Sequence, residues 1–256
     1  MIFETHAHYD DDAFDEDRDG LLAGMPEQGI GRIVNIGADM KSSANSVALA
    51  EKYPYIYAAV GVHPSDVEGI TEKDMDQLIT WAAMDKVVAI GEIGLDYHYE
   101  EPARELQKKW FCRQMEIARK VGLPIVVHSR DAAKDTLDTM LEMEAGNIGG
   151  VIHCYSYTKE FAREFLNLDY YIGIGGVLTF SNAKKLKEAA EYIPMDHIVL
   201  ETDSPYLAPV PNRGKRNSSL NLPYVVQALA EIKGMTAQEI EDITWDNAMR
   251  LYRMNR

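Results

Sequence analysis

The stretch that decides the fold runs from Val87 to Arg130. It begins with VVAIGEIGLD (Val87–Asp96), a nearly unbroken apolar run typical of strands buried on both faces of a parallel sheet. Residues 103–121 follow with apolar side chains on a 3.6-residue period, at Leu106, Trp110, Phe111, Met115, Ala118 and Val121. Gly122 and Pro124 end this helix and lead into PIVVHSR (Pro124–Arg130). The stretch therefore predicts a parallel strand–helix–strand unit.

The same unit recurs along the chain. Eight segments have strand character: Ile2–His8, Ile30–Ala38, Ile56–Pro64, Val87–Asp96, Pro124–Arg130, Gly149–Ser156, Tyr170–Gly176 and Ile198–Pro205. Helical intervals separate them, and Thr236 with Glu239 forms a capping box before a last helix. Eight such units in 256 residues predict a single (β/α)8 TIM barrel over residues 1–256. A doubly wound open sheet is the alternative, although no GxGxxG motif follows the first strand.

Composition limits the function and the setting. The chain has 26 basic and 41 acidic residues, a formal charge of −15, which disfavours proteins that coat nucleic acid electrostatically. Two cysteines, Cys112 and Cys154, cannot build a disulfide framework, so we expect a reduced, cytoplasmic setting. No secretory signal opens the sequence and no apolar run reaches the ~18 residues of a membrane span. We expect no membrane association, and no feature indicates a protein partner.

Histidines and carboxylates stand at the predicted strand ends. His6 and His8 alternate on one face of the first strand, where they could share a cation or be satisfied by backbone groups. Glu92 lies within an apolar strand, so its charge needs either a basic partner or a metal ion. Taken singly, His128 and His153 are more typical of satisfied core residues, and Asp203 of a turn or a helix cap.

The combination favours a metal centre. Six side chains come from five strands, all at the end where barrel enzymes place their active sites. Four imidazoles and two carboxylates can hold two divalent cations if one carboxylate bridges, and Glu92 is our candidate for the bridge.

The sequence also resembles the TatD family of metal-dependent deoxyribonucleases, within the amidohydrolase-like barrels. The matching segments, in the family's order, are FETHAH (3–8), GVHP (61–64), GEIGLDY (91–97), LPIVVHSRDA (123–132), IHCY (152–155), ETDSPY (201–206) and RGKRN (213–217). The resemblance implies a barrel with metal ligands at His6, His8, Glu92, His128, His153 and Asp203. It also implies Mg²⁺-dependent activity, whereas histidine-rich ligation suits Zn²⁺, Mn²⁺ or Co²⁺. The identity of the two ions (Mg, Mn or Zn) therefore stays open.

Two positions depart from the family pattern. Glu4 stands where the family usually has Asp, and Ser218-Ser219 replaces the usual Glu-Pro. The second change lies in a loop expected to border the substrate, so it leaves substrate preference open.

Candidate substrate contacts lie near these ligands. His63 could support the metal ligands, contact phosphate or simply pack at its strand end. Arg130 could hold a phosphate oxygen or pair with Asp131 or a neighbouring acid. Arg213 belongs to the one dense basic cluster, which could meet a nucleic-acid backbone or simply be solvated. The acid-rich stretch Tyr9–Asp19 follows the first strand, and we favour a solvated helix start over a position at the barrel mouth. We expect Cys154 and Tyr155 to serve in packing.

These features and the resemblance together predict a metal-dependent hydrolase of phosphodiester bonds. The resemblance implies a deoxyribonuclease, which we expect to act on nucleic-acid ends in a 3'-5' exonuclease-like manner. Glu92 would position the cations and Asp203 would serve as general base. The alternative is a hydrolase of an acyl substrate (amide, lactone or aminoacyl ester) using the same metal site. A non-catalytic binding protein is a third possibility, against which the complete set of six candidate ligands argues.

Overall fold

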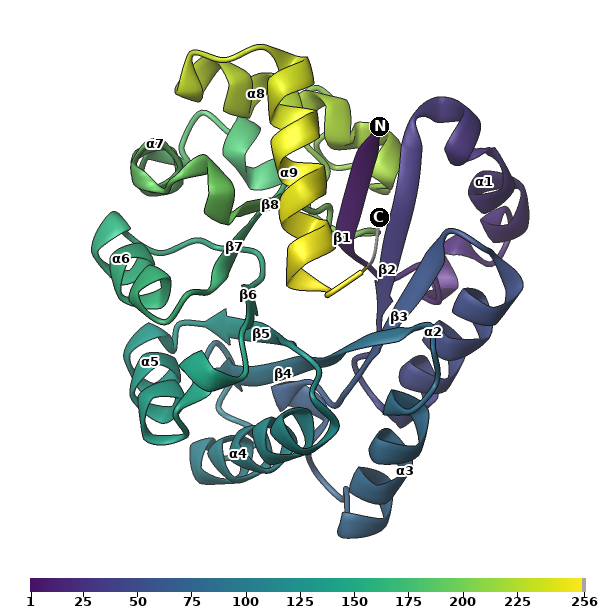
Figure 1. Cartoon of the computed structure of the whole chain (residues 1–256), viewed down its shortest axis with the longest axis vertical. Coiled ribbons are helices and arrows are strands. Elements are labelled where there is room, and N and C mark those ends of the chain that lie inside the picture. Colours follow the sequence, from purple (N-terminus) through teal and green to yellow (C-terminus); the bar gives the residue numbers. More distant parts are fainter. Residues whose placement is uncertain (255–256) are drawn as a thin grey trace.

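Eight parallel strands form one sheet in the order β1 to β8, and a ring of helices surrounds them (Figure 1). The computed structural model describes residues 1–254. The strands are β1 (Ile2–Ala7), β2 (Ile30–Ile36), β3 (Ile56–Val60), β4 (Val87–Asp96), β5 (Ile125–Arg130), β6 (Gly150–Ile152), β7 (Tyr171–Ile174) and β8 (Ile198–Leu200). This arrangement confirms the predicted (β/α)8 barrel.

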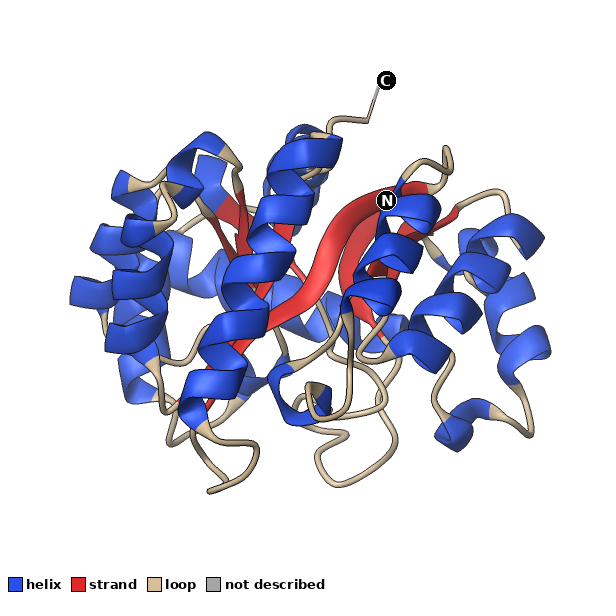
Figure 2. Cartoon of the chain, turned by 90° about the horizontal axis from the view of Figure 1, so that it is seen from below, coloured by secondary structure: helices blue, strands red, loops and turns tan. Residues whose placement is uncertain are grey.

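The helices pack outside the strands, as the side view shows (Figure 2). They are α1 (Arg18–Gly24), α2 (Met40–Lys52), α3 (Glu72–Ala82), α4 (Arg104–Val121), α5 (Ala133–Glu142), α6 (Lys159–Asn167), α7 (Lys184–Tyr192), α8 (Leu222–Lys233) and α9 (Ala237–Leu251). None of the helices between residues 1 and 254 combines the length and apolarity needed to cross a membrane. Cys112 and Cys154 are free thiols; the cytoplasmic location stays a prediction.

Hydrogen bonds after β8 nearly close the barrel. The Asp203 N–H donates to the His6 carbonyl at 3.0 Å, and the His8 N–H donates to the Ser204 carbonyl at 2.8 Å. Both bonds join the segment that carries the candidate ligand Asp203 to the end of β1. Closure of the barrel and placement of these ligands therefore depend on the same backbone contacts.

A close approach between β4 and β5 explains one glycine of the GEIGLD motif. Gly94 pairs with His128 in the sheet register, and a Cβ at Gly94 would lie 1.9 Å from the His128 carbonyl oxygen. Gly94 also has a φ of +147°, a conformation that side chains disfavour. Glycine at this position thus lets the strand that carries His128 lie against the strand that carries Glu92.

Helix α9 packs against β1 and β8, beside which it is drawn in yellow in Figure 1. The rings of Phe3 and Trp245 lie 5.5 Å apart, the Tyr252 hydroxyl donates to the Thr5 carbonyl, and the Asn247 amide donates to the Ile198 carbonyl. The cavity that forms the candidate site lies at the carboxyl ends of the strands.

Most strands end earlier than the sequence predicted. His8, His63, His153 and Asp203 all lie just beyond their strands, in the loops that follow. The apolar pattern marks where a strand is buried, whereas these polar residues turn away from the ladder to face one another.

Candidate metal centre

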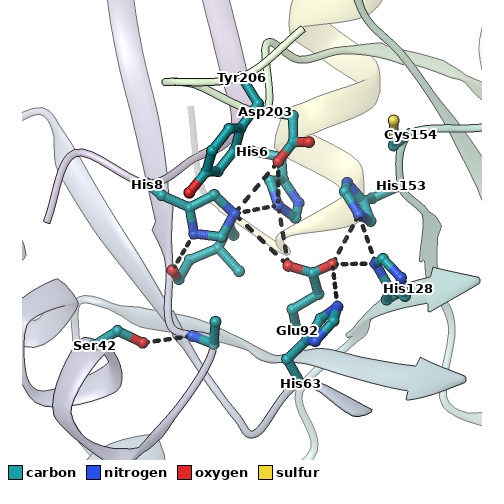
Figure 3. Close-up of polar contacts among 12 residues, drawn as sticks. His6, His8, Ser42, His63, Glu92, His128, His153, Cys154, Asp203 and Tyr206 are labelled. Atoms are coloured by element: carbon teal, nitrogen blue, oxygen red, sulfur yellow. Dashed lines mark hydrogen bonds and ion pairs between the residues drawn. The ribbon is translucent and has the colours of Figure 1, made fainter. Parts of the chain in front are cut away.

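A cavity of about 630 Å³ opens at the carboxyl ends of the strands. Its wall includes five of the six predicted ligands, namely His8, Glu92, His128, His153 and Asp203. The sixth, His6, is 1% exposed and lies between His8 and His153 (Figure 3). The structure therefore brings together all six side chains that the sequence singled out.

One half of the site is built by β1 and the segment after β8. His6 Nε2 and His8 Nε2 face each other at 3.1 Å. Asp203 Oδ1 lies 3.4 Å from His8 Nε2 and 3.7 Å from His6 Nε2. Asp203 has a φ of +56°, so it follows a sharp turn in the backbone after β8. Two imidazole nitrogens and a carboxylate oxygen thus converge on one point.

The other half is built by β3 to β6. Glu92 Oε1 lies 2.6 Å from His128 Nδ1, 2.8 Å from His153 Nε2 and 3.8 Å from His63 Nε2. His63, Glu92 and His128 each offer a ligand atom within 4.8 Å of the others. His63, whose role the sequence left open between supporting the ligands, contacting phosphate and packing, therefore belongs to this ligand cluster as well as to the cavity wall.

Glu92 joins the two halves. While Oε1 faces His128 and His153, Oε2 lies 3.5 Å from His6 Nε2 and 3.7 Å from His8 Nε2. The side chain is 4% exposed. Burial raises the pKa of Glu92, but the charge of His153 and the hydrogen bonds from His128 and His153 outweigh burial and hold the pKa well below its usual value. Glu92 is thus an ionised carboxylate positioned between two sets of imidazoles.

The histidines divide into two electrostatic classes. Burial and the nearby His153 lower the pKa of His6 to about 4, and burial and His128 lower that of His63 to about 3. Burial also opposes the charge of His8, but the hydrogen bond and charge of Asp203 raise its pKa to about 9. Glu92 likewise overcomes burial and raises the pKa of His153 to about 10. Asp203 and Glu92 therefore stabilise positive charge at the centre of the cluster.

Hydrogen bonds on the outer side of the His8 and His128 rings orient the inner ring nitrogens for cation binding. The His8 Nδ1–H donates to the Ile36 carbonyl at 2.9 Å, so once His8 loses its second proton the lone pair lies on Nε2, facing Asp203. His128 Nε2 lies 3.0 Å from Asp96 Oδ2, which leaves Nδ1 facing Glu92. Imidazole nitrogens oriented in this way, with shared carboxylate oxygens, are the donor set of divalent-cation sites. The imidazole nitrogens and carboxylate oxygens of this cluster are therefore suited to bind divalent metal ions.

The predicted substrate contacts have different surroundings. Arg130 lines the cavity, lies over the ring of Tyr99 at 5.9 Å and has no ion pair within residues 1–254; Asp131 contacts His98 instead. Arg213 is exposed, stacks on Phe180 at 4.4 Å and does not line the cavity. Arg130, but not Arg213, is placed to meet a ligand in the cavity.

The acid-rich stretch after β1 corrects one expectation. We favoured a solvated helix start, but Asp10 and Asp11 line the cavity, and the Tyr206 hydroxyl donates to Asp11 across the mouth. Only the later acids are solvated, and Asp17 pairs with Arg216 of the basic cluster at 2.6 Å. The reason is that the chain turns immediately after His8, so its next residues remain at the mouth.

Cys154 provides a second correction. We expected it only to pack, but it lines the cavity, with a φ of +46°, while its sulfur points away from the ligand cluster (Figure 3). Since β6 ends at Ile152, strand alternation no longer applies at Cys154. The neighbouring Tyr155 is buried and its hydroxyl bonds to the Thr158 carbonyl, so the packing role is confirmed.

The two departures from the family pattern contact each other. Glu4 is completely buried, its Oε1 accepts the N–H groups of His6 and Thr202, and its Oε2 accepts the Ser219 hydroxyl at 2.9 Å. Burial outweighs these bonds and raises the pKa of Glu4 to about 8. Ser219 thus ties the loop before α8 to the end of β1.

Sequence reasoning missed two acids that support the histidines. Asp96 ends β4 and contacts His128, and Glu201 follows β8 and lies 3.7 Å from His153 Nδ1. Their spacing could have revealed them. Each is an acid in an apolar strand or just after one, and Glu201 is two residues before Asp203, as Glu4 is before His6.

Comparisons with known proteins agree with this geometry. A family model described as TatD related DNase matches residues 3–253. The chain is 42% identical to the uncharacterized metal-dependent hydrolase YabD of Bacillus subtilis, over 100% of both chains, and 34% identical to YcfH of Escherichia coli K12, over 100% of this chain and 97% of the relative. The crystal structure of YjjV, a TatD homologue from E. coli K12, superposes with a TM-score of 0.93 at 30% identity and covers 99% of this chain and 98% of its own. The chain therefore belongs to the TatD family of metal-dependent hydrolases.

Proposed function

We propose that the protein hydrolyses phosphodiester bonds at nucleic-acid ends with two divalent cations. The residues that would hold the ions are His6, His8, Glu92, His128, His153 and Asp203, and His63 lies close enough to Glu92 and His128 to join them. The observation that carries the proposal is the division of Glu92, whose two carboxylate oxygens face different sets of imidazoles.

When bound, the cations polarise the phosphoryl group and activate a water molecule. The chain supplies the proton acceptor. Burial raises the pKa of Asp203, but the hydrogen bond to His8 and the charges of His153 and His6 outweigh burial and lower it. Asp203 is thus ionised and lines the cavity. Its Oδ1 faces His6 and His8, so Oδ2 takes the proton as general base.

Arg130 is the residue that favours phosphate. It is the one lysine or arginine among the described residues that line the cavity, and it has no competing ion pair in residues 1–254. A guanidinium can donate two parallel hydrogen bonds to phosphate oxygens. We assign Arg130 to the phosphate next to the scissile bond.

Cavity size and charge favour a strand end. A volume of about 630 Å³ lies in the range of small-molecule sites. Asp10 and Asp11 stand at the mouth and would repel a long polyanion within about 8 Å at physiological salt. A terminal nucleotide reaches the cations with few further phosphates near these acids. The family description, TatD related DNase, supports the same class of substrate.

A second candidate is hydrolysis of an acyl substrate by the same centre. The two aspartates at the mouth favour it, because they would attract a cationic group adjacent to an ester or amide.

A metal-reconstituted assay separates the candidates. Chelated protein is reloaded with Mg²⁺, Mn²⁺ or Zn²⁺ and given oligonucleotides labelled at either end, or aminoacyl and lactone esters. His128→Ala and Asp203→Ala serve as controls for contaminating activity. We expect metal-dependent release of terminal nucleotides that both variants abolish. Turnover of acyl substrates alone would refute the phosphodiester proposal.

A further inference from the structure

Behind the metal centre lies a second, fully enclosed cluster. Among residues 1–254, the buried side-chain polar atoms without a hydrogen-bond partner are His6 Nδ1, His153 Nδ1 and Glu201 Oε2. These three residues are 1%, 4% and 1% exposed, and one ligand-type atom of each lies within 4.8 Å of the others. Because unpartnered buried polar atoms are costly and rare, their convergence indicates a shared role.

The two rings are arranged to act together. His6 and His153 stack with centroids 3.8 Å apart and planes 11° apart, side by side as Figure 3 shows. Their Nε2 atoms lie 3.5 Å and 2.8 Å from the nearer Glu92 oxygen. The remaining nitrogen of each ring is Nδ1, and His153 Nδ1 is 3.7 Å from Glu201 Oε1, within ion-pair distance.

The backbone of neighbouring segments packs closely around the Glu201 carboxylate. Gly173 of β7 lies against it, and a Cβ at Gly173 would be 2.3 Å from Glu201 Oε2. The Cys154 N–H donates to Oε1 and fixes the other oxygen. The carboxylate is thus held against the rings by the backbone of β7 and by the turn after β6.

The other histidines of the centre show what such an acceptor does. The Ile36 carbonyl lies behind His8 and Asp96 lies behind His128, each on the nitrogen opposite the cluster. An acceptor there keeps the ring proton on the far side and leaves the near lone pair for a cation. His6 and His153 have only Glu201 in that position among the contacts of residues 1–254.

We propose that Glu201 is a positioning residue shared by both halves of the centre: its carboxylate is the acceptor available to the Nδ1–H groups of His153 and His6 when cations are bound, and so leaves both Nε2 lone pairs, on the side of Glu92, free to bind them. The proposal rests on the proposed metal-binding role of these histidines and not on the substrate. It predicts that one carboxylate outside the ligand set controls the affinity for both cations.

The test measures cation binding without substrate. Wild type, Glu201→Gln, Glu201→Asp and Gly173→Ala are stripped of metal and titrated with Co²⁺ against a chelator, with visible absorption recorded. Glu201→Gln keeps the size of the side chain and removes the charge, whereas Gly173→Ala displaces the carboxylate and keeps the charge. Glu4→Gln is the matched control, because Glu4 is equally buried and two residues before a ligand but accepts backbone and hydroxyl donors.

We expect Glu201→Gln to weaken Co²⁺ binding by roughly 10- to 100-fold for both ions and to alter the Co²⁺ spectrum. Gly173→Ala should act in the same direction, Glu201→Asp should recover part of the affinity, and Glu4→Gln should stay within about twofold of wild type. Circular dichroism checks that each variant is folded; if Glu201→Gln does not fold, Gly173→Ala and Glu201→Asp decide. Wild-type affinity and spectrum in the folded Glu201 and Gly173 variants would overturn this proposal alone. Wild type that binds no Co²⁺ would overturn the proposed metal centre together with it.

Discussion

Replacing Glu92 by glutamine tests whether one carboxylate serves two cations. The variant keeps the shape of the side chain but removes the charge that faces His128 and His153 on one side and His6 on the other. Removing one partner of a buried charge pair costs about 3–5 kcal/mol. Because the charge is divided between two ions, we assign about half of that cost to each. At about 1.4 kcal/mol per tenfold, each ion should bind roughly 10- to 60-fold more weakly.

Calorimetric titration of the chelated protein with Mn²⁺ or Zn²⁺ measures both sites. His128→Ala provides the contrast, because His128 contacts only one half and its loss should weaken one ion and spare the other. Glu72→Gln, an exposed carboxylate paired with Arg113 on the surface, should change neither. If Glu92→Gln weakened a single ion, or none, the bridging role would be wrong.

Three further outcomes follow from the site. Asp203→Asn should lower kcat by about 10²- to 10⁴-fold, as expected for loss of a general base, measured at saturating metal; unchanged kcat would exclude that role. Because the pKa values of His8 and His153 are raised to about 9 and 10, both rings are protonated at pH 7 and must lose protons to bind a cation, so metal affinity should fall as pH falls. Calorimetry in buffers of different ionisation enthalpy should show proton release, and a pH-independent affinity would contradict these pKa shifts. Arg130→Ala should raise KM for a phosphodiester by about 10-fold, the value of one charge-assisted contact, and leave KM for a neutral ester unchanged; equal effects on both substrates would remove Arg130 from phosphate recognition.

The repeating strand–helix pattern was enough to predict the barrel. Runs such as Val87–Asp96 are nearly continuous and apolar, which is typical of a covered parallel sheet. Gly122 ends α4 as predicted, and it does so in the left-handed conformation. Strand ends were less predictable. The loss of pairing after Ile152 or Leu200 depends on tertiary contacts with neighbouring strands, which the sequence does not encode locally.

The sequence singled out residues whose chemistry is unusual for their position, and the structure brings them together. A carboxylate such as Glu92 inside an apolar strand needs a partner, and the strand-end rule brings it to the histidines. The positions of Asp10 and Cys154 could not be derived, because each follows an abrupt turn that breaks strand alternation. The position of Glu201 two residues before Asp203 was an available signal, but which ring nitrogens it faces depends on other strands and shows only in the assembled barrel.

The most direct test of the account is an anomalous diffraction map of crystals grown with Mn²⁺ or Zn²⁺. The account predicts two peaks, one on each side of Glu92, the first beside His6, His8 and Asp203 and the second beside His128 and His153. A single peak, or peaks that do not contact Glu92, would contradict it.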